Sequence, residues 1–349
     1  MESLINKEIR EAVNNLSSKL QRLNLYNLDI SAYNKKYLKQ YIDNYSFYMF
    51  LYSQLLLKAI KKLNRPISES TFVDYGGGCG ILSYLAKEIG FKVVVYNDIY
   101  QVSINDTQTI SKSIGITIDH YICGGVEDFV KEIKLNSIKP DLICSFDVLE
   151  HIYDLEKWFE KIADIESGFS LLFMTSANSN NPYIVNRLKK LHIKAEYKGL
   201  EKTIGWKEID LNTSFLETRK NIISKKFPKL KNDEVKKLSL KTRGLRKDDI
   251  EKVVKHYLES GKINYQIKHP TNTCDPYSGN WTENLIDLKR LKILIKNNNL
   301  IVDVTNSTYA YSNNGILNIP KYILNQIIHI LGPRHLLFSP TYTLEIQKN

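Results

Sequence analysis

The spacing of apolar residues changes along the chain and divides it into four regions. Residues 1–67 have helical spacing, because tyrosines recur at steps of three or four and would share one helix face. Residues 71–176 alternate short apolar runs with amphipathic segments, whereas 178–280 are mostly polar with helical patterns. Helix and strand patterns resume at residue 283. The tyrosines of the first region are Tyr33, Tyr37, Tyr41, Tyr45, Tyr48 and Tyr52.

The second region predicts a parallel β-sheet. Five buried strands are expected, at Thr71–Tyr75, Lys92–Tyr96, Thr117–Ile122, Asp141–Phe146 and Ser170–Met174. Amphipathic helices are expected between them, at Ile81–Ile89, Ser103–Ser113, Val126–Ile133 and Asp154–Ile165. Strands and helices that alternate in this way form a parallel sheet covered on both faces, and right-handed crossovers make it doubly wound.

The last region completes the sheet. We expect a helix at Glu283–Lys296, a strand at Leu300–Val304 and a final strand within His335–Ile346. The predicted fold class is therefore α/β, with a doubly wound, mostly parallel seven-stranded sheet, a helical N-terminal extension and a large helical insertion after the fifth strand. The predicted domains are a helical extension at 1–67, a core at 68–177 plus 281–349, and a basic helical insertion at 178–280.

The positive charge of the chain is confined to the insertion. The formal net charge is +11, yet residues Asn178 to Pro270 hold 23 Lys and Arg against 11 Asp and Glu. The rest of the chain is therefore almost neutral. Such a surface suits an anionic partner such as a nucleic acid, a phosphorylated substrate or an acidic membrane. A solvated helical face in a lysine-rich proteome explains it equally well, since the chain is also rich in Asn and Ile.

Composition points to an ordinary globular protein of the cytoplasm. Hydrophobic residues make up 43% of the chain and charged residues 25%, which allows a substantial core. No apolar stretch approaches the ~18 residues of a membrane-spanning helix, and the N-terminus lacks the features of a signal peptide. The four cysteines are scattered, without a CxxC pair, and are expected to be reduced packing residues.

A glycine-rich turn is the strongest chemical signal in the sequence. Residues 74–80 read Asp-Tyr-Gly-Gly-Gly-Cys-Gly, directly after a strand and before a helix. Glycines at Gly76, Gly78 and Gly80 allow a ligand to approach the backbone closely, and the helix N-terminus offers unpaired N–H groups. The spacing D-x-G-x-G-x-G differs from the G-x-G-x-x-G of dinucleotide sites. An acid at Asp74 can bind the ammonium group of an amino-acid ligand.

A second acid, Asp98, follows the second strand. A carboxylate at this place in a doubly wound sheet can accept hydrogen bonds from both hydroxyls of an adenosine ribose. The two acids together favour a ligand that combines an amino acid with adenosine over a dinucleotide.

Four segments, in order, resemble the motifs of class I S-adenosylmethionine (SAM)-dependent methyltransferases. They are FVDYGGGCGILSYLA, VVVYND, GGVEDF and DLICSFDVLEHIYDLEKWFEKI, within residues 70–176. The last segment resembles the group with a D/E-V-L/I-E-H signature, which includes ubiquinone-pathway O-methyltransferases. This resemblance implies a Rossmann-like fold and SAM as methyl donor.

The resemblance also implies roles for individual residues. Asp74 and the three glycines would cradle the methionine end of SAM, and Asp98 would hold the ribose. The strip from Gly125 to Asp128 would lie beside the adenine. Because the family often has an acid where this chain has Gly125, adenine contact would rest on the Val126 backbone with Glu127 or Asp128.

Asp147, Glu150 and His151 follow the fourth strand, and three interpretations of them remain open. They can cap the next helix and shape the SAM pocket, with Asp147 as a cofactor-binding residue. Alternatively, His151 is a general base for a hydroxyl nucleophile, since imidazole titrates near neutral pH. In the third interpretation they bind a divalent cation with a distant histidine (His192, His256 or His269), as in the similar small-RNA 3′-terminal ribose methyltransferases. We predict no metal site.

The segment from His269 to Glu283 predicts an ordered loop. It is dense in Asn, Asp, Pro, Gly and aromatic residues, which are typical of defined turns. It leads into a helix that Asn280 or Thr282 would cap. His269 and Asp275 are candidates for contact with a polar substrate and, with His151, for catalysis. The loop can equally be a turn that anchors the insertion.

The predicted function is SAM-dependent methylation, most simply of an oxygen of a small molecule such as a sugar, a lipid-linked compound or a secondary metabolite. The acceptor would be a small molecule, and the basic insertion leaves room for an anionic one. An RNA or protein methyltransferase that docks its substrate on the basic insertion, with or without a metal ion, is the alternative. Nucleic acid as a partner is possible but not favoured, and the fold alone does not decide the substrate.

Overall fold

The computed structural model describes residues 2–166, 168–199, 213–311, 315–316 and 318–348. They form two compact units. The first unit comprises Met1–Leu149, Glu156–Ser176 and Leu288–Asn349, and the second comprises Glu150–Leu155 and Ala177–Asp287. The domain boundaries inferred from the sequence stay a prediction, and part of the inferred insertion, 200–212, lies outside the described residues.

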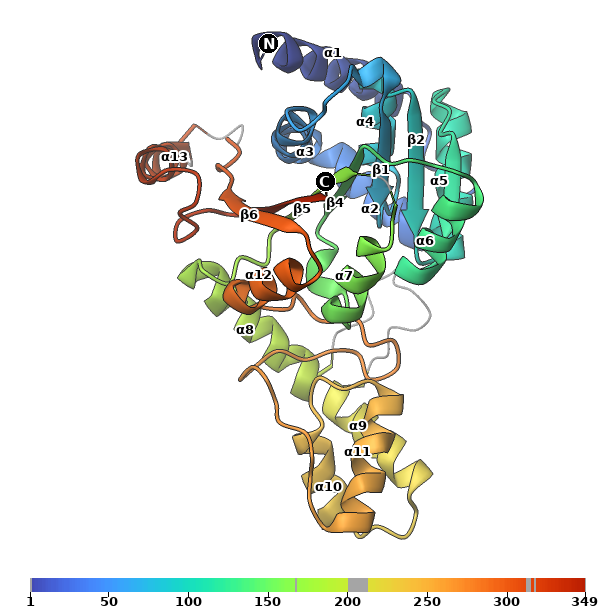
Figure 1. Ribbon diagram of the computed structural model, residues 1–349, viewed down its shortest axis with the longest axis vertical. Coiled ribbons are helices and arrows are strands. Elements are labelled where there is room, and N and C mark those ends of the chain that lie inside the picture. The colour runs from blue at the N-terminus through green and yellow to red at the C-terminus, as the bar shows by residue number, and fades with distance from the viewer. Residues whose placement is uncertain (1, 167, 200–212, 312–314, 317, 349) are drawn as a thin grey trace. The chain divides into compact units, whose positions relative to one another are not determined.

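The first unit contains a seven-stranded sheet in the order β3-β2-β1-β4-β5-β7-β6 (Figure 1). Strands β1 to β5 are parallel, and β7 is antiparallel to both of its neighbours. This is the predicted doubly wound arrangement. The strands are β1 (Thr71–Tyr75), β2 (Val93–Asp98), β3 (His120–Cys123), β4 (Leu142–Phe146), β5 (Phe169–Thr175), β6 (Ile301–Asn306) and β7 (Tyr342–Lys348).

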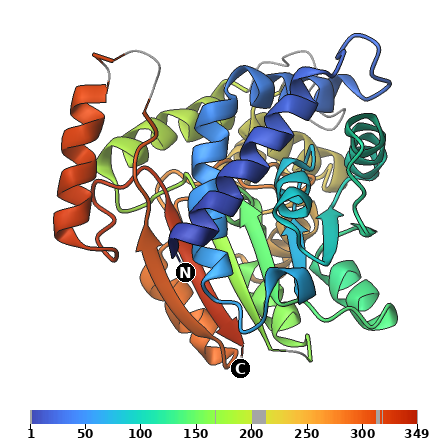
Figure 2. The same ribbon diagram turned by 90° about the horizontal axis from the view of Figure 1, so that it is seen from above.

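Helices follow the strands as the pattern predicts. Between the parallel strands lie α4 (Ile81–Ile89), α5 (Gln101–Ile114), α6 (Val126–Leu135) and α7 (Leu155–Ala163). After β5 come α12 (Leu288–Asn297), which precedes β6, and α13 (Asn318–Leu331), which precedes β7 and which the sequence analysis did not identify. Both views place α13, in red, apart from the strands (Figures 1 and 2). Ile328 is its buried residue.

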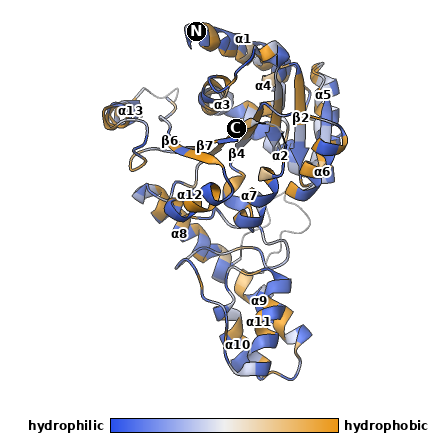
Figure 3. Cartoon of the chain, in the orientation of Figure 1, coloured by the Kyte–Doolittle hydropathy of each residue, from blue (hydrophilic) through white to orange (hydrophobic). Residues whose placement is uncertain are grey.

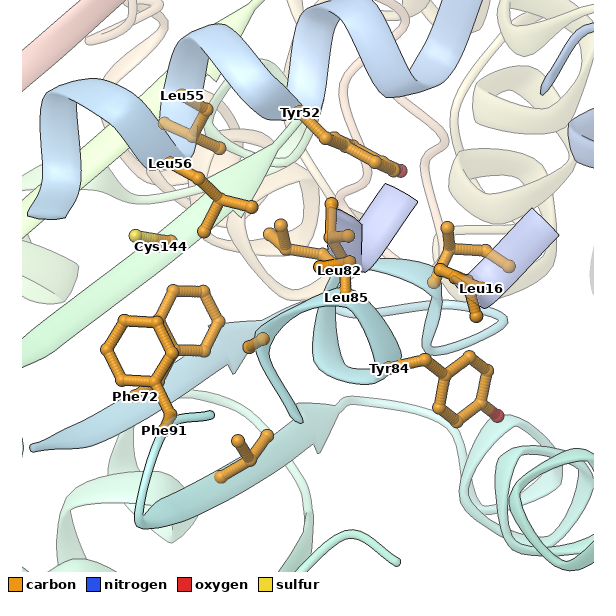
Figure 4. Close-up of a cluster of buried hydrophobic side chains, with 14 of the residues drawn as sticks. Leu16, Tyr52, Leu55, Leu56, Phe72, Leu82, Tyr84, Leu85, Phe91 and Cys144 are labelled. Carbon is orange, nitrogen blue, oxygen red and sulfur yellow. The ribbon is translucent and has the colours of Figure 1, made fainter. Parts of the chain in front are cut away.

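Residues on the two faces of β1 contact different helices, because successive side chains of a strand point to opposite faces. Phe72 packs into a core with residues of α4 and of the N-terminal helices, such as Leu85 and Leu56 (Figure 4). Tyr75 lies on the other face, where its ring contacts Phe129 at 5.4 Å and Trp158 at 5.4 Å between centroids. The sheet is therefore covered on both sides, as a parallel sheet requires.

Three helices form the N-terminal part: α1 (Glu2–Gln21), α2 (Ala32–Asp43) and α3 (Tyr45–Ile60). Figure 2 shows α1, in dark blue, in front of the sheet. The sequence predicted that the tyrosines lie on one helix. They instead lie on two, because the helical conformation is interrupted between α2 and α3 at Asn44. This residue has φ −116° and ψ 32°, and its N–H donates back to the carbonyl of Gln40. The tyrosines nonetheless pack together across the break, since the hydroxyl of Tyr52 donates to that of Tyr41.

The second unit is mainly helical. Its helices are α8 (Pro182–Tyr197), α9 (Phe215–Lys226), α10 (Asn232–Lys241) and α11 (Lys247–Ser260). Each of α9, α10 and α11 carries both hydrophobic and hydrophilic residues (Figure 3). The apolar residues meet in a core of their own, which consists of Ile222, Ile223, Val235, Leu238, Ile250 and Val254. This buried core explains why a mostly polar sequence folds in this region.

The helix expected from Glu283 begins only at Leu288. Glu283 has φ +48°, in the left-handed region, so it cannot belong to a right-handed helix. Neither Asn280 nor Thr282 is therefore the cap of this helix, and that prediction was wrong. Among the described residues, no helix is both long enough and apolar enough to cross a lipid bilayer.

Candidate functional site

Three acidic residues of the first unit lie where parallel strands end. Asp74 is in β1, Asp98 is the last residue of β2, and Asp147 directly follows β4. Because these strands are parallel and adjacent, their carboxyl ends form one edge of the sheet. Ligands of open α/β sheets bind at this edge.

The glycine-rich turn lies between Asp74 and α4. Gly78 has φ +54°, and a Cβ added to it would meet no atom within 4 Å. Gly80 has φ +76°, and a Cβ there would lie 2.6 Å from the side chain of Thr107. Glycine is thus required at Gly80 by packing, whereas at Gly78 it is favoured by the left-handed backbone and the surroundings are open.

Asp98 holds this turn in place. Its Oδ2 accepts a hydrogen bond from the N–H of Gly78 at 3.0 Å, and its Oδ1 accepts one from the N–H of Tyr100 at 2.9 Å. The side chain is nearly buried. The second strand and the glycine turn, 20 residues apart, are therefore joined through one carboxylate.

Asp74 is buried beneath the turn and binds the helix that follows. Its Oδ2 accepts hydrogen bonds from the N–H of Ser83 at 3.0 Å and from the hydroxyl of Ser83 at 2.7 Å. The pKa of Asp74 is raised to about 7, mainly by burial and to a smaller extent by the charge of Asp98, while the hydrogen bonds from Ser83 lower it. Asp74 thus supports the turn from below, in addition to the ligand contact that the sequence predicts.

The start of α2 covers the glycine turn, which the sequence analysis did not foresee. Asn34 is buried, its Nδ2 donates to Asp106 at 2.7 Å, and Cys79 of the turn donates its S–H to Asn34. Tyr33 is close enough to Asp98 that this carboxylate, after burial and Tyr37, helps to raise the pKa of the phenol. The only signal in the sequence was a polar residue within a tyrosine-rich helix face.

The strip from Gly125 to Asp128 begins α6. Gly125 is the N-cap of the helix, and Val126 is half-buried. Glu127 instead points to solvent, where its Oε1 lies 2.7 Å from Nζ of Lys157, and this ion pair lowers the pKa of Glu127. Of the residues considered for adenine contact, Val126 is therefore better placed than Glu127.

Asp147 has an unusual backbone conformation. Its φ is +51°, in the left-handed region, which Asp tolerates better than most residues. Its N–H donates to Met174 of β5 at 2.9 Å, and its Oδ1 accepts from the N–H of Ser176 at 2.7 Å. It also contributes to raised pKa values of Tyr41 and Tyr48, for which burial is the main cause. Asp147 therefore faces the tyrosines of α2 and α3.

In the second unit, His151 is held by the loop that the sequence singled out. Its Nδ1 lies 2.8 Å from the carbonyl oxygen of Trp281. A carbonyl oxygen only accepts, so Nδ1 carries the proton and donates it. In the neutral ring the lone pair is then on Nε2, 4.0 Å from Oε1 of Glu283. A base oriented in this way can remove a proton from a hydroxyl group.

Glu283 is a residue that sequence reasoning missed as a functional candidate. Glu150, His151 and Glu283 each offer one ligand atom, and these atoms lie within 4.8 Å of one another. The trio can hold a divalent cation or let Glu283 stabilise protonated His151. The distant histidines considered from the sequence, namely His192, His256 and His269, do not belong to this group. Nothing in the residue pattern marked Glu283, because its position depends on the fold of the loop.

Asp275 organises the loop itself. Its Oδ1 accepts hydrogen bonds from the N–H groups of Tyr277 at 2.7 Å and Ser278 at 2.9 Å. Its own N–H donates to the carbonyl of Asn280 at 2.9 Å. These bonds close the turn that precedes Trp281, whose ring stacks on Tyr153 at 6.2 Å between centroids.

His269 also binds its own backbone. Its Nδ1 accepts from the N–H groups of Thr271 at 3.2 Å and Asn272 at 3.1 Å, so Nε2 carries the proton. Burial lowers the pKa of His269, and His192, Lys189 and Arg243 lower it further. A neutral ring with this tautomer has no lone pair to accept a substrate proton. No hydrogen bond of the described residues joins any two of the side chains of His151, His269 and Asp275.

Part of the chain is similar to known methyltransferases. A family model described as "Methyltransferase domain" matches residues 45–204. No curated protein sequence matches the chain. Among solved structures, the chain is similar to an S-adenosylmethionine-dependent methyltransferase from Clostridium acetobutylicum, with 13% identity over 90% of this chain and 98% of that one, and a TM-score of 0.43. It is also similar to a putative S-adenosylmethionine-dependent methyltransferase from Listeria monocytogenes, with 12% identity over 86% and 99% of the two chains, and a TM-score of 0.40.

Proposed function

We propose that this chain, which matches a methyltransferase-domain model over residues 45–204, is a SAM-dependent methyltransferase that transfers the methyl group to a hydroxyl oxygen of a small molecule. The observation that supports this proposal is the orientation of His151, whose Nδ1 is fixed by a carbonyl oxygen and whose Nε2 is available as a base. Methyl transfer to a hydroxyl requires removal of one proton, and a positioned imidazole is suited to this task.

The proposed reaction is a single displacement. The acceptor oxygen attacks the methyl carbon of SAM, the new C–O bond forms, and the C–S bond breaks. The sulfur keeps the electron pair of that bond, so its positive charge is lost and S-adenosylhomocysteine leaves. The acceptor proton passes to Nε2 of His151, and Glu283 stabilises the resulting imidazolium, because the two side chains lie 4.0 Å apart. Alignment of donor and acceptor would supply most of the remaining rate acceleration.

Cofactor recognition is assigned to the sheet edge of the first unit. Asp98 would accept hydrogen bonds from the ribose, and the turn with Gly76, Gly78 and Gly80 would hold the methionine end. Val126 would lie beside the adenine, and Asp74 and Asp147 would form the remaining wall of the SAM pocket. The left-handed backbone and open surroundings of Gly78 support this assignment. Glu127 would contact the adenine only if its ion pair with Lys157 breaks.

Acceptor recognition is assigned to the second unit. The insertion at 178–280 would form the substrate lid, with His151, His269 and Asp275 as its functional side chains. The D-V-L-E-H segment at 147–151 supports placing the chain near the ubiquinone-pathway O-methyltransferase group. The free thiols of Cys79, Cys123, Cys144 and Cys274 support a reducing compartment, which for this protein we take to be the cytoplasm.

The decisive experiment offers labelled SAM to the purified protein with three pools: small hydroxylated metabolites, RNA and protein. We expect label in the small-molecule pool. RNA methylation remains the second candidate because of the excess positive charge between 178 and 270. Binding of RNA through that surface would weaken steeply with added salt, since neutralised phosphates release counterions. Label only in RNA, with such a salt dependence, would replace the proposed acceptor class.

A further inference from the structure

The second unit contains a pocket of about 240 Å³ that none of the assignments above uses. It is formed by the end of α8, by the residues after α10 and by the segment after His269. Six of its lining residues are His192, Glu196, Tyr197, Arg243, Pro270 and Thr271. The volume is below the range typical for drug-sized ligands, about 300–1,000 Å³, so it suits a small group rather than a large molecule.

The one carboxylate among these six residues is already neutralised. Nη2 of Arg219 donates to Oε1 of Glu196, and both side chains are almost completely buried. The hydroxyl of Thr273 donates to the other oxygen, Oε2, at 2.8 Å. Glu196 therefore adds no net negative charge to the pocket, because the buried guanidinium balances it.

Arg243 brings a positive charge that is not balanced. Its Nη2 donates to the carbonyl of His269 at 2.9 Å, which fixes the direction of the guanidinium. Its Nε is buried and has no hydrogen-bond partner. Within the described part of the chain Arg243 forms no ion pair. A buried N–H without an acceptor is costly, so this group is expected to meet an acceptor that the chain does not supply.

The charge of Arg243 contributes to lowering the pKa values of two histidines, His192 and His269. His192 is fully buried, its Nε2 donates to the carbonyl of Glu283 at 3.0 Å, and its Nδ1 lies 3.2 Å from the hydroxyl of Thr271. Burial lowers the pKa of His192, and Arg243 lowers it further, as it does for His269. The neutral form of both rings is therefore favoured, and Arg243 provides the positive charge of the pocket.

We propose that this pocket binds an oxyanion, a phosphate or a carboxylate, carried by the methyl acceptor. Arg243 lines the pocket and provides the charge, its Nε has no acceptor within the chain, and Thr271 and Tyr197 also line the pocket. Guanidinium groups bind both kinds of oxyanion through charge-assisted hydrogen bonds. That the ligand is the acceptor rests on the proposed function, whereas the binding of an oxyanion does not.

Calorimetric titration of the full-length protein with inorganic phosphate, and separately with acetate, tests the pocket at constant ionic strength in sodium chloride. Wild type should bind at least one of the two anions saturably, and the preferred anion indicates the class of the acceptor. Arg243→Gln should weaken that binding by about tenfold or more, as expected when a charge-assisted pair is lost. Arg187→Gln removes the same charge from an exposed position on α8 and should leave the affinity unchanged.

Two further measurements keep the result interpretable. Thermal melting establishes that Arg243→Gln is folded, and Arg243→Lys, which keeps the charge without the fork of N–H groups, should retain part of the affinity. Saturable binding that is lost equally in both glutamine variants would overturn the proposal, as would the absence of saturable binding in wild type. Neither outcome would affect the methyltransferase assignment, because no methyl transfer is measured.

Discussion

The two units build their candidate sites by different means. In the first unit the important groups come from a short stretch of chain: the glycine turn begins within three residues of Asp74, and Asp98 ends the next strand. In the second unit His151 depends on Trp281, which is 130 residues away, and Glu283 joins it only through the fold of the loop. On the proposed assignments, the cofactor site is specified by contiguous motifs, whereas the acceptor site is assembled from distant segments.

If this division is right, the largest effect should come from the base. His151→Ala should reduce methyl transfer by about 10²–10⁴-fold, the usual contribution of a general base, while SAM affinity stays within a few-fold of wild type. Turnover and calorimetric SAM binding are measured together. His256→Ala, on α11 of the same unit, is the control and should behave as wild type.

A metal-dependent role for the same residues gives a different pattern. If Glu150, His151 and Glu283 held an essential cation, a chelator would abolish turnover and added Mg²⁺ or Mn²⁺ would restore it. We expect turnover to survive chelation. Loss of SAM affinity in parallel with activity in His151→Ala would remove the distinction between the two regions.

Asp98→Asn should give the next largest effect, confined to the cofactor. The variant keeps an acceptor for one of the two N–H groups but loses the charge, so SAM binding should weaken by about 1–3 kcal/mol. Titration with SAM, S-adenosylhomocysteine and NAD measures this effect. Tighter binding of NAD than of S-adenosylhomocysteine to the wild type would mean that the glycine turn serves another ligand.

The loop variant Asp275→Ala should lose methyl transfer and cost about 1–2 kcal/mol of stability in the second unit, because two N–H groups lose their acceptor. Asp275→Asn keeps an oxygen acceptor and separates the two possible roles. If Asp275 only shapes the turn, the Asn variant should be close to wild type in turnover and melting temperature. A folded Asn variant without activity would instead place the charge of Asp275 in contact with the acceptor.

A separate effect concerns the pH dependence of stability in the first unit. The pKa of Asp74 is about 7 in the folded chain against 3.8 for a free side chain, so the folded state holds more protons between these values. Stability should therefore fall as pH rises from about 4 to about 7. Asp74→Asn should remove this part of the slope in denaturant unfolding, and Asp43→Asn, an exposed position, should not. If stability varied with pH equally in both variants, groups other than Asp74 would cause the pH dependence.

The fold was largely predictable because its determinants are local. Buried strands and amphipathic helices have distinct periods, so the order from β1 to β5 followed from the pattern of residues 71–176. The helix α13 was missed although many of its residues are apolar, and Ile328 is the one residue of this helix that is buried. The start of α12 was misplaced because the left-handed backbone of Glu283 depends on the loop fold around it.

The sequence by itself determined the glycine turn, the acids at the ends of β1 and β2, and with them a cofactor that combines an amino acid with adenosine. It also marked His151 and the loop from His269 to Glu283 as chemically unusual. Only the tertiary structure decided which nitrogen of His151 carries the proton, that Glu283 lies beside it, and that the buried Nε of Arg243 faces no acceptor. The physical reason is that motif contacts lie within a few residues, whereas hydrogen-bond partners across 130 residues are fixed only by packing.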